Sequence, residues 1–161
     1  MKLDCRVEQA LQAINFVERY KELSDKFSLD RTPKEKRLNI ITGELIFDVF
    51  EDLGYRAKFD GREKFFYIEP IKENGYTFGF HISIFKGLVE LIWSVRDSQN
   101  KVILGTPLME FSRRLISPDY RIMDPVIANY DDFEDVMKIA FEMYEDFKQA
   151  FIKIAQRINR C

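Results

Sequence analysis

The sequence is poor in several residue types, and each shortage excludes a class of protein. It holds two cysteines, one histidine, seven glycines and five prolines in 161 residues. Two cysteines form neither a disulfide framework nor a zinc site by themselves, and one histidine excludes most histidine-based metal sites. So few glycines and prolines leave no room for long linkers or low-complexity tails. We therefore expect one globular domain, residues 1–161, without a metal or cofactor.

Long apolar runs and a strong net charge are also missing. No apolar run approaches the ~18 residues that cross a membrane, and the first ten residues carry charges where a secretory signal is apolar. The net charge of −2 gives no global electrostatic attraction to nucleic acid. These features predict a cytoplasmic protein with Cys5 and Cys161 as reduced thiols; a bridge between them is the alternative.

Apolar residues recur at helical spacing near both ends of the chain. The first such stretch predicts a helix from Leu3 to about Leu23. A capping pattern at Thr32 and Pro33 predicts a second helix that Gly54 ends. Its expected buried residues are Leu38, Ile41, Leu45, Val49, Phe50 and Leu53. The last stretch predicts a long helix across a sheet, capped by Asp131 with Glu134. Its expected apolar stripe is Phe133, Met137, Ala140, Tyr144, Phe147, Phe151, Ile154 and Ile158.

Between these helices, short reversals separate extended runs. They are Asp60-Gly61, which would place Lys58 opposite Glu63, then Asn74-Gly75, Lys86-Gly87 and the segment 97–100. A two-residue turn at Lys86-Gly87 makes every cross-strand pair on one face apolar, and a shift of one residue would destroy that match. The pairs are Ile84 with Val89, Ile82 with Leu91, Phe80 with Trp93, and Phe78 with Val95.

The order of elements is therefore ααβββββαα. Short links favour an antiparallel sheet of about five strands, packed by N-terminal helices and the long C-terminal helix, which is an α+β fold. After the last strand, Thr106-Pro107 opens a short helix. The run 65–71 is apolar on both faces, so either a bulge near Pro70 or a covering helix is needed.

The other face of the central hairpin is polar. It carries Thr77, His81, Ser83, Glu90 and Arg96. His81, Ser83 and Glu90 resemble a base, a nucleophile and an acid, but a serine within a strand has neither a strained turn nor an oxyanion hole. No phosphate-binding glycine loop occurs either. The sequence thus predicts no enzyme; a small enzyme or ligand-binding domain using this polar face is the alternative.

Charged residues gather in two places. Arg56, Lys58, Arg62 and Lys64 lie among Phe59, Phe65 and Phe66, which would suit base stacking, although protection of an edge strand explains the charges more simply. We predict no nucleic-acid partner. Acidic residues mark the last helix: Asp131, Asp132, Glu134, Asp135, Glu142, Glu145 and Asp146. The helix dipole and solvation can explain them, but such a surface would also steer and hold a basic partner, for example a nuclease.

Two stretches carry a family resemblance: GYTFGFHISIFKGLVELIWSV and NYDDFEDVMKIAFEMYEDFK. They resemble small cytosolic immunity proteins of bacterial polymorphic toxin systems, including those of contact-dependent growth inhibition. The resemblance implies a non-enzymatic protein that binds and neutralises one cognate toxin acting in the cytosol, with no membrane partner. It assigns no functional residue, because such proteins share no catalytic motif. A homo-oligomeric adaptor working through the last helix is a further alternative.

Overall fold

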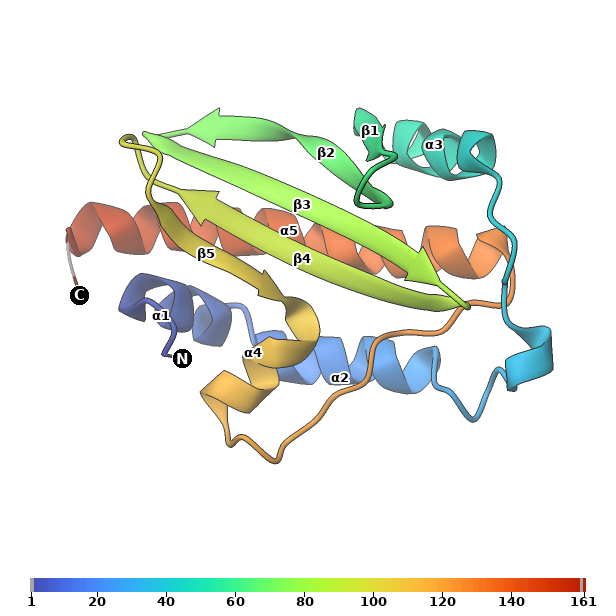
Figure 1. The fold of residues 1–161 in the computed structure, drawn as a ribbon. Coiled ribbons are helices and arrows are strands. Elements are labelled where there is room, and N and C mark those ends of the chain that lie inside the picture. Colours follow the sequence, from blue (N-terminus) through green and yellow to red (C-terminus); the bar gives the residue numbers. More distant parts are fainter. Residues whose placement is uncertain (1, 160) are drawn as a thin grey trace.

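Five α-helices, one short 3-10 helix and five β-strands form the part of the chain that the computed structural model describes, residues 2–159 and 161 (Figure 1). The helices are α1 (Cys5–Ala13), α2 (Phe16–Lys26), η1 (Lys34–Lys36), α3 (Gly43–Asp52), α4 (Leu108–Leu115) and α5 (Tyr130–Arg157). The strands are β1 (Ala57–Asp60), β2 (Phe65–Glu73), β3 (Tyr76–Phe85), β4 (Leu88–Arg96) and β5 (Val102–Pro107). The predicted α+β class is confirmed.

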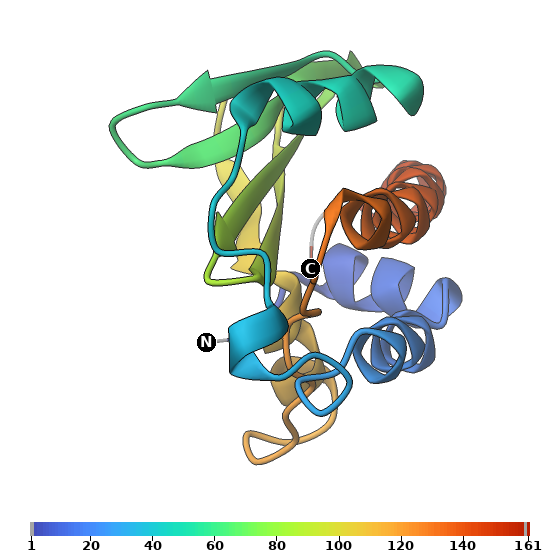
Figure 2. The same ribbon diagram turned by 90° about the vertical axis from the view of Figure 1, so that its right-hand side faces the viewer.

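The strands form one antiparallel sheet in the order β1-β2-β3-β4-β5. Helices α1, α2 and α5 lie on one side of this sheet, and no helix of the described residues covers the other side (Figure 2). The covered face includes Phe78, Phe80, Ile82, Val89, Leu91, Trp93 and Val95. The open face includes Thr77, Gly79, His81, Ser83, Glu90, Ile92, Ser94 and Arg96. Along β4 the side chains alternate between buried and partly exposed, as expected for a sheet that is covered on one side.

The predicted pairing of β3 with β4 is confirmed at every position. Phe80 lies opposite Trp93, and Thr77 lies opposite Arg96. The turns at Asn74-Gly75 and Lys86-Gly87 have positive φ at both residues, the backbone that two-residue hairpins require. Trp93 is fully buried, and its ring lies 6.2 Å from that of Phe80. The covered face of the β3–β4 hairpin therefore forms one side of the hydrophobic core.

The apolar residues of β2 are divided between the two faces of the sheet. The pairing of β2 with β3 shifts between Ile68 and Ile71, which confirms a bulge near Pro70. Phe66 lies opposite Ile82 on the covered face, where its ring lies 5.4 Å from that of Phe47 in α3. Phe65 points to the open face and stacks on His81. The bulge therefore occurs, whereas the alternative of a helix over the second face is wrong: among the described residues no helix covers the open face, where Phe65 and Tyr67 lie (Figure 2).

The prediction of one continuous helix from Leu3 to about Leu23 is wrong. The chain forms α1 and α2 with a break at Asn15, which has a φ of 54°. Asparagine tolerates this left-handed backbone better than most residues. The break lets Phe16 enter the core, where its ring meets Trp93 edge-on at 5.7 Å.

The helix predicted to begin near Thr32 is also wrong. Only Lys34–Lys36 forms a single 3-10 turn, and α3 begins at Gly43. The intervening chain is held in an extended course, because the Leu38 N–H donates to the Ile127 carbonyl. Leu45, expected to be buried, is 43% exposed, and Ile46 takes its place in the core.

The first hairpin has a longer loop than predicted. Lys58 lies opposite Tyr67 rather than Glu63, so residues 61–64 form the loop. The Asp60 carboxylate accepts hydrogen bonds from two backbone N–H groups of this loop, and Lys64 adopts the positive φ that closes it. Lys58 instead pairs with Glu69 at 3.4 Å.

The long last helix is confirmed as α5, with 28 residues lying across the sheet. Its predicted start is wrong, because Asn129 caps it by accepting from the Asp132 N–H. Most of the predicted apolar stripe is buried, but Ile158 lies just beyond the helix.

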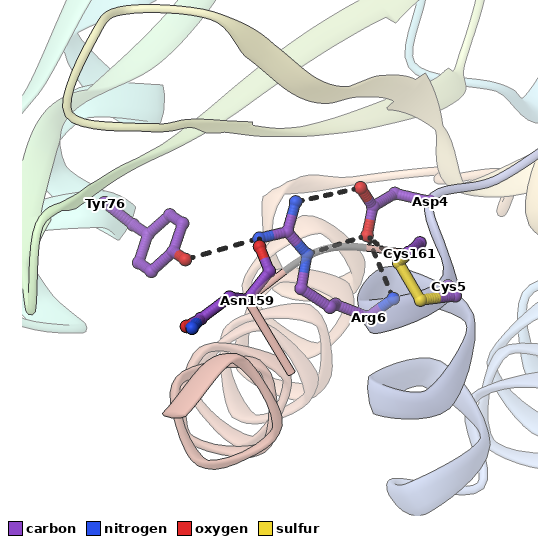
Figure 3. Close-up of a disulfide and its surroundings, with 6 residues drawn as sticks. All are labelled: Asp4, Cys5, Arg6, Tyr76, Asn159 and Cys161. Atoms are coloured by element: carbon purple, nitrogen blue, oxygen red, sulfur yellow. Dashed lines mark hydrogen bonds and ion pairs between the residues drawn. A yellow bond between two sulfur atoms is a disulfide. The ribbon is translucent and has the colours of Figure 1, made fainter. Parts of the chain in front are cut away.

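The two cysteines form a disulfide, so the prediction of reduced thiols is wrong for this structure (Figure 3). Helix α1 packs beside α5, which brings the Cα atoms of Cys5 and Cys161 to 5.6 Å. Arg6 joins the same corner. Its guanidinium pairs with Asp4 at 2.9 Å and donates to the Tyr76 hydroxyl and the Asn159 carbonyl. Pairing between residues 156 positions apart depends on the tertiary fold, which cysteine spacing does not reveal.

Candidate functional site

The five polar residues predicted to share a face do so. Thr77 lies opposite Arg96, and Ser83 opposite Glu90, on the open face. Within the described residues, however, no hydrogen bond joins His81, Ser83 and Glu90. The His81 ring stacks on Phe65 with centroids 4.4 Å apart, and burial lowers its pKa, partly opposed by Asp60. These three residues do not form a nucleophile relay of the serine-hydrolase type.

The acidic residues predicted as a partner surface separate into two groups. Three of them have partners inside the fold. Asp132 accepts from Arg31 at 3.0 Å and from the Ala128 N–H at 2.9 Å. Asp146 pairs with Arg19 at 2.9 Å. Glu145 accepts from the Tyr55 hydroxyl at 2.9 Å and from Lys148 at 3.1 Å. The Glu145–Lys148 pair lies within α5. The other contacts join α5 to residues of neighbouring segments.

The other group is free of such contacts. Asp131, Asp135 and Glu142 are exposed, Glu134 is partly exposed, and none forms an ion pair among residues 2–159 and 161. Lys138 is exposed on the same helix.

Helix α3 adds acidic residues that sequence reasoning missed. Glu44, Asp48, Glu51 and Asp52 are exposed and also lack ion pairs among the described residues. Phe50 contacts Phe133 and Phe141, so α3 packs on the N-terminal half of α5. The sequence does contain a sign of this surface, because Glu44, Asp48 and Asp52 are spaced four residues apart and so share one helix face. We name these seven exposed carboxylates the acidic surface: Glu44, Asp48, Glu51, Asp52, Asp131, Asp135 and Glu142.

The basic hairpin does not offer a continuous stacking surface. Phe59 and Phe66 pack together on the covered side, with ring centroids 4.8 Å apart, whereas Phe65 points to the open face. Phe66 is only 6% exposed. The three phenylalanines therefore cannot stack successive bases of one strand.

A group of buried and partly buried polar side chains lies where α3, α5 and the start of β1 meet. Lys148 is almost fully buried, and its ammonium lies over the Tyr144 ring at 5.0 Å while it pairs with Glu145. Tyr55 stacks on Phe141 with centroids 3.8 Å apart. Burial raises the pKa of both Tyr55 and Tyr144 well above the usual range, so both hydroxyls stay protonated at neutral pH. Through the Tyr55–Glu145 hydrogen bond, this group connects α5 to the segment between α3 and β1.

Asp124 is a second titratable group that the sequence did not single out. It accepts a hydrogen bond from the buried Tyr20 hydroxyl at 3.1 Å. Burial raises its pKa to about 6, Glu90 adds to the effect, and the Tyr20 hydrogen bond opposes it. The proton is thus bound more tightly in the folded state. The resulting stabilisation is complete below about pH 4 and is lost as the pH rises through about 6.

Replacing Asp124 by asparagine tests this assignment. Asparagine keeps an acceptor for Tyr20 but cannot ionise, so Asp124→Asn should raise the free energy of unfolding at about pH 7.5 by up to about 3 kcal/mol. At about pH 4 the difference from wild type should nearly vanish. Urea unfolding of both proteins across this range measures the effect. An equal difference at both pH values would mean that Asp124 does not titrate as described.

No family model, curated protein or solved structure matches this chain. Among the described residues, no helix combines the length and the apolar character needed to cross a membrane.

Proposed function

We propose that this chain acts without catalysis, by binding a basic protein partner through the acidic surface, as an immunity protein neutralises its cognate toxin. The observation that carries the proposal is the set of seven exposed carboxylates on two helices that pack together, none of which forms an ion pair within residues 2–159 and 161. A toxin that acts on nucleic acid has a basic site, and such a site would be complementary to this surface.

The ion pairs within the fold indicate which acidic residues of α5 are available to contact a partner. Asp132, Glu145 and Asp146 already have partners, so their replacement would change contacts within the fold as well as any interface. For Asp146, whose side chain is 56% exposed, the effect on stability should be small. Asp131, Asp135 and Glu142 have no such role, and their charges remain available to steer encounter. This division favours the exposed residues of the acidic surface as the contact region.

The proposal includes a cytoplasmic location, where the toxin would act. Cytoplasmic glutathione keeps most protein thiols reduced, whereas disulfides persist in oxidising compartments. The functional form in the cytoplasm would then be the reduced protein, which its hydrophobic core keeps folded. The Cys5–Cys161 disulfide would form on oxidation.

Affinity capture from the native host tests the proposal. Wild-type protein should retain one basic protein at equal stoichiometry. Asp131→Lys/Asp135→Lys/Glu142→Lys should lose it, because the surface charge is reversed where the partner docks. The control is Glu22→Lys/Glu63→Lys/Asp119→Lys, which changes the net charge equally at exposed positions elsewhere. Equal capture by both variants, or no stoichiometric protein with wild type, would contradict the proposal.

A further inference from the structure

The open face of the sheet is organised in three successive rows of side chains. Strand pairing places Lys72, Thr77, Arg96 and Val102 in the first row. The second row holds Gly79, Ser94 and Gly105. The third holds Tyr67, His81, Ile92 and Pro107. Thr77 in the first row and His81 in the third are four positions apart on β3, which is about 13 Å in an extended strand.

The second row is the floor of a depression of about 470 Å³. Gly79 and Gly105 have no side chains to fill it, and Ser94 between them contributes only a hydroxyl. A Cβ on Gly79 would collide with the Ser94 Oγ, so this floor is closely fitted. Thr77, His81 and Arg96 stand around it. Concave sites lined mainly by apolar groups with a few converging polar groups are typical of small-molecule binding.

The two ends of the depression differ in chemistry. At the first row, Thr77 and Arg96 line the depression, and Lys72 is paired with Thr77 at its border. Neither Arg96 nor Lys72 forms an ion pair among the described residues. No carboxylate lines the depression, although the chain has 27 acidic residues. The third row is aromatic and apolar, with the Tyr67 ring 6.1 Å from that of His81. Three acids lie near this face. Glu69, at the β2 bulge beside Gly79, pairs with Lys58 at 3.4 Å. Asp60 lies close enough to act on His81, and Glu90 lies beyond the third row, opposite Ser83.

The polar side chains in the depression lack internal partners. Thr77, His81 and Ser94 make no side-chain hydrogen bond within residues 2–159 and 161. Arg96 makes one, a 3.3 Å bond to the Asn100 carbonyl, which leaves most of its donors free. Partly exposed groups of this kind are satisfied by water until a ligand replaces it.

From this arrangement we propose that the open face binds a small organic carboxylate with a flat, apolar body. The carboxylate lies at Arg96, Lys72 and Thr77, the body crosses the floor of Gly79, Ser94 and Gly105, and its far end rests against Tyr67, His81 and Ile92. Arginine binds carboxylates with two parallel hydrogen bonds, and the glycine floor admits a planar group. This site is separate from the acidic surface and is independent of the proposed partner binding.

Titration of the ¹⁵N-labelled protein with 2-naphthoate tests the site, with neutral 2-naphthamide as the matched probe. We expect amide shifts concentrated at residues 77–81, 92–96 and 102–105, and binding of the amide about tenfold weaker. Arg96→Gln should weaken naphthoate binding by about tenfold. Gly105→Leu should abolish it by filling the floor. A Cβ at Gly105 meets only Val102, at an ordinary 3.7 Å, so the fold should persist.

Lys153→Gln is the control, because it removes an exposed cation on α5, away from the depression. It should bind naphthoate as wild type does. The proposal is overturned by shifts that fall elsewhere, by equal affinity for naphthoate and naphthamide, or by unchanged binding in both the Arg96 and Gly105 variants. Retention of partner binding in these two variants would show that the two sites act separately.

Discussion

Replacing Trp93 by alanine should lower the free energy of unfolding by about 3–5 kcal/mol, the largest effect expected for a single side chain here. Trp93 is fully buried and contacts aromatic rings from α2, β3, α4 and α5. Those rings belong to Phe16, Phe80, Phe111, Tyr144 and Phe147. For a chain of this length the loss corresponds to a fall in melting temperature of about 10 °C or more.

Trp93→Phe is the matched control for this change. The indole N–H of Trp93 has no hydrogen-bond partner among the described residues, so phenylalanine removes an unsatisfied donor while keeping a ring. It should cost only about 1–2 kcal/mol. Calorimetry or urea unfolding of both variants measures the difference. A Trp93→Ala protein as stable as wild type, yet altered in binding, would mean that this residue serves a site rather than the core.

Reduction of the Cys5–Cys161 disulfide should have a comparable effect. The bond joins residues 156 positions apart, and closing so long a loop restricts the unfolded chain by about 4–5 kcal/mol in the chain-entropy treatment. The urea midpoint of the oxidised protein should therefore exceed that of the reduced protein by roughly 2 M. The reduced protein should remain folded, because the core and the Arg6 contacts do not depend on the bond.

The Cys5→Ser/Cys161→Ser variant serves as the reference for the reduced state. It should unfold at the midpoint of the reduced protein and should not respond to dithiothreitol. Identical midpoints for oxidised and reduced wild type would show that the bond contributes no stability. Unfolding on reduction alone would instead argue against a cytoplasmic working form.

The sequence predicts best where local chemistry and burial agree. The pairing of β3 with β4 is predictable because Lys86-Gly87 fixes the turn while the apolar residues fix the face. The apolar stripe of α5 is predictable for the same reason, since its period matches its burial. The open polar face follows directly from that pairing, so its five residues were placed together correctly.

The sequence predicts poorly where a distant contact decides the local structure. The segment after Thr32 stays extended because Leu38 bonds to Ile127, although its local pattern suits a helix. In the sequence, Asp132 resembles an ordinary carboxylate in the first turn of a helix. In the structure it is buried, and it accepts hydrogen bonds from Arg31 and from the Ala128 N–H. The partner of each cysteine likewise depends on how α1 packs against α5. The acidic surface was only half predicted, because the packing of α3 on α5 that completes it is a tertiary feature.

The central claim is that the exposed carboxylates of α3 and α5 steer a basic protein to this chain. Its most direct test is the association rate with the purified partner, measured by stopped flow from about 50 to about 300 mM salt. Wild type should associate fastest at low salt and slow steeply as salt screens the charges. Asp131→Lys/Asp135→Lys/Glu142→Lys should be slower and nearly independent of salt, whereas Glu22→Lys/Glu63→Lys/Asp119→Lys should stay closer to wild type. Equal rates and equal salt dependence for wild type and the first variant would contradict the claim and place the interface elsewhere.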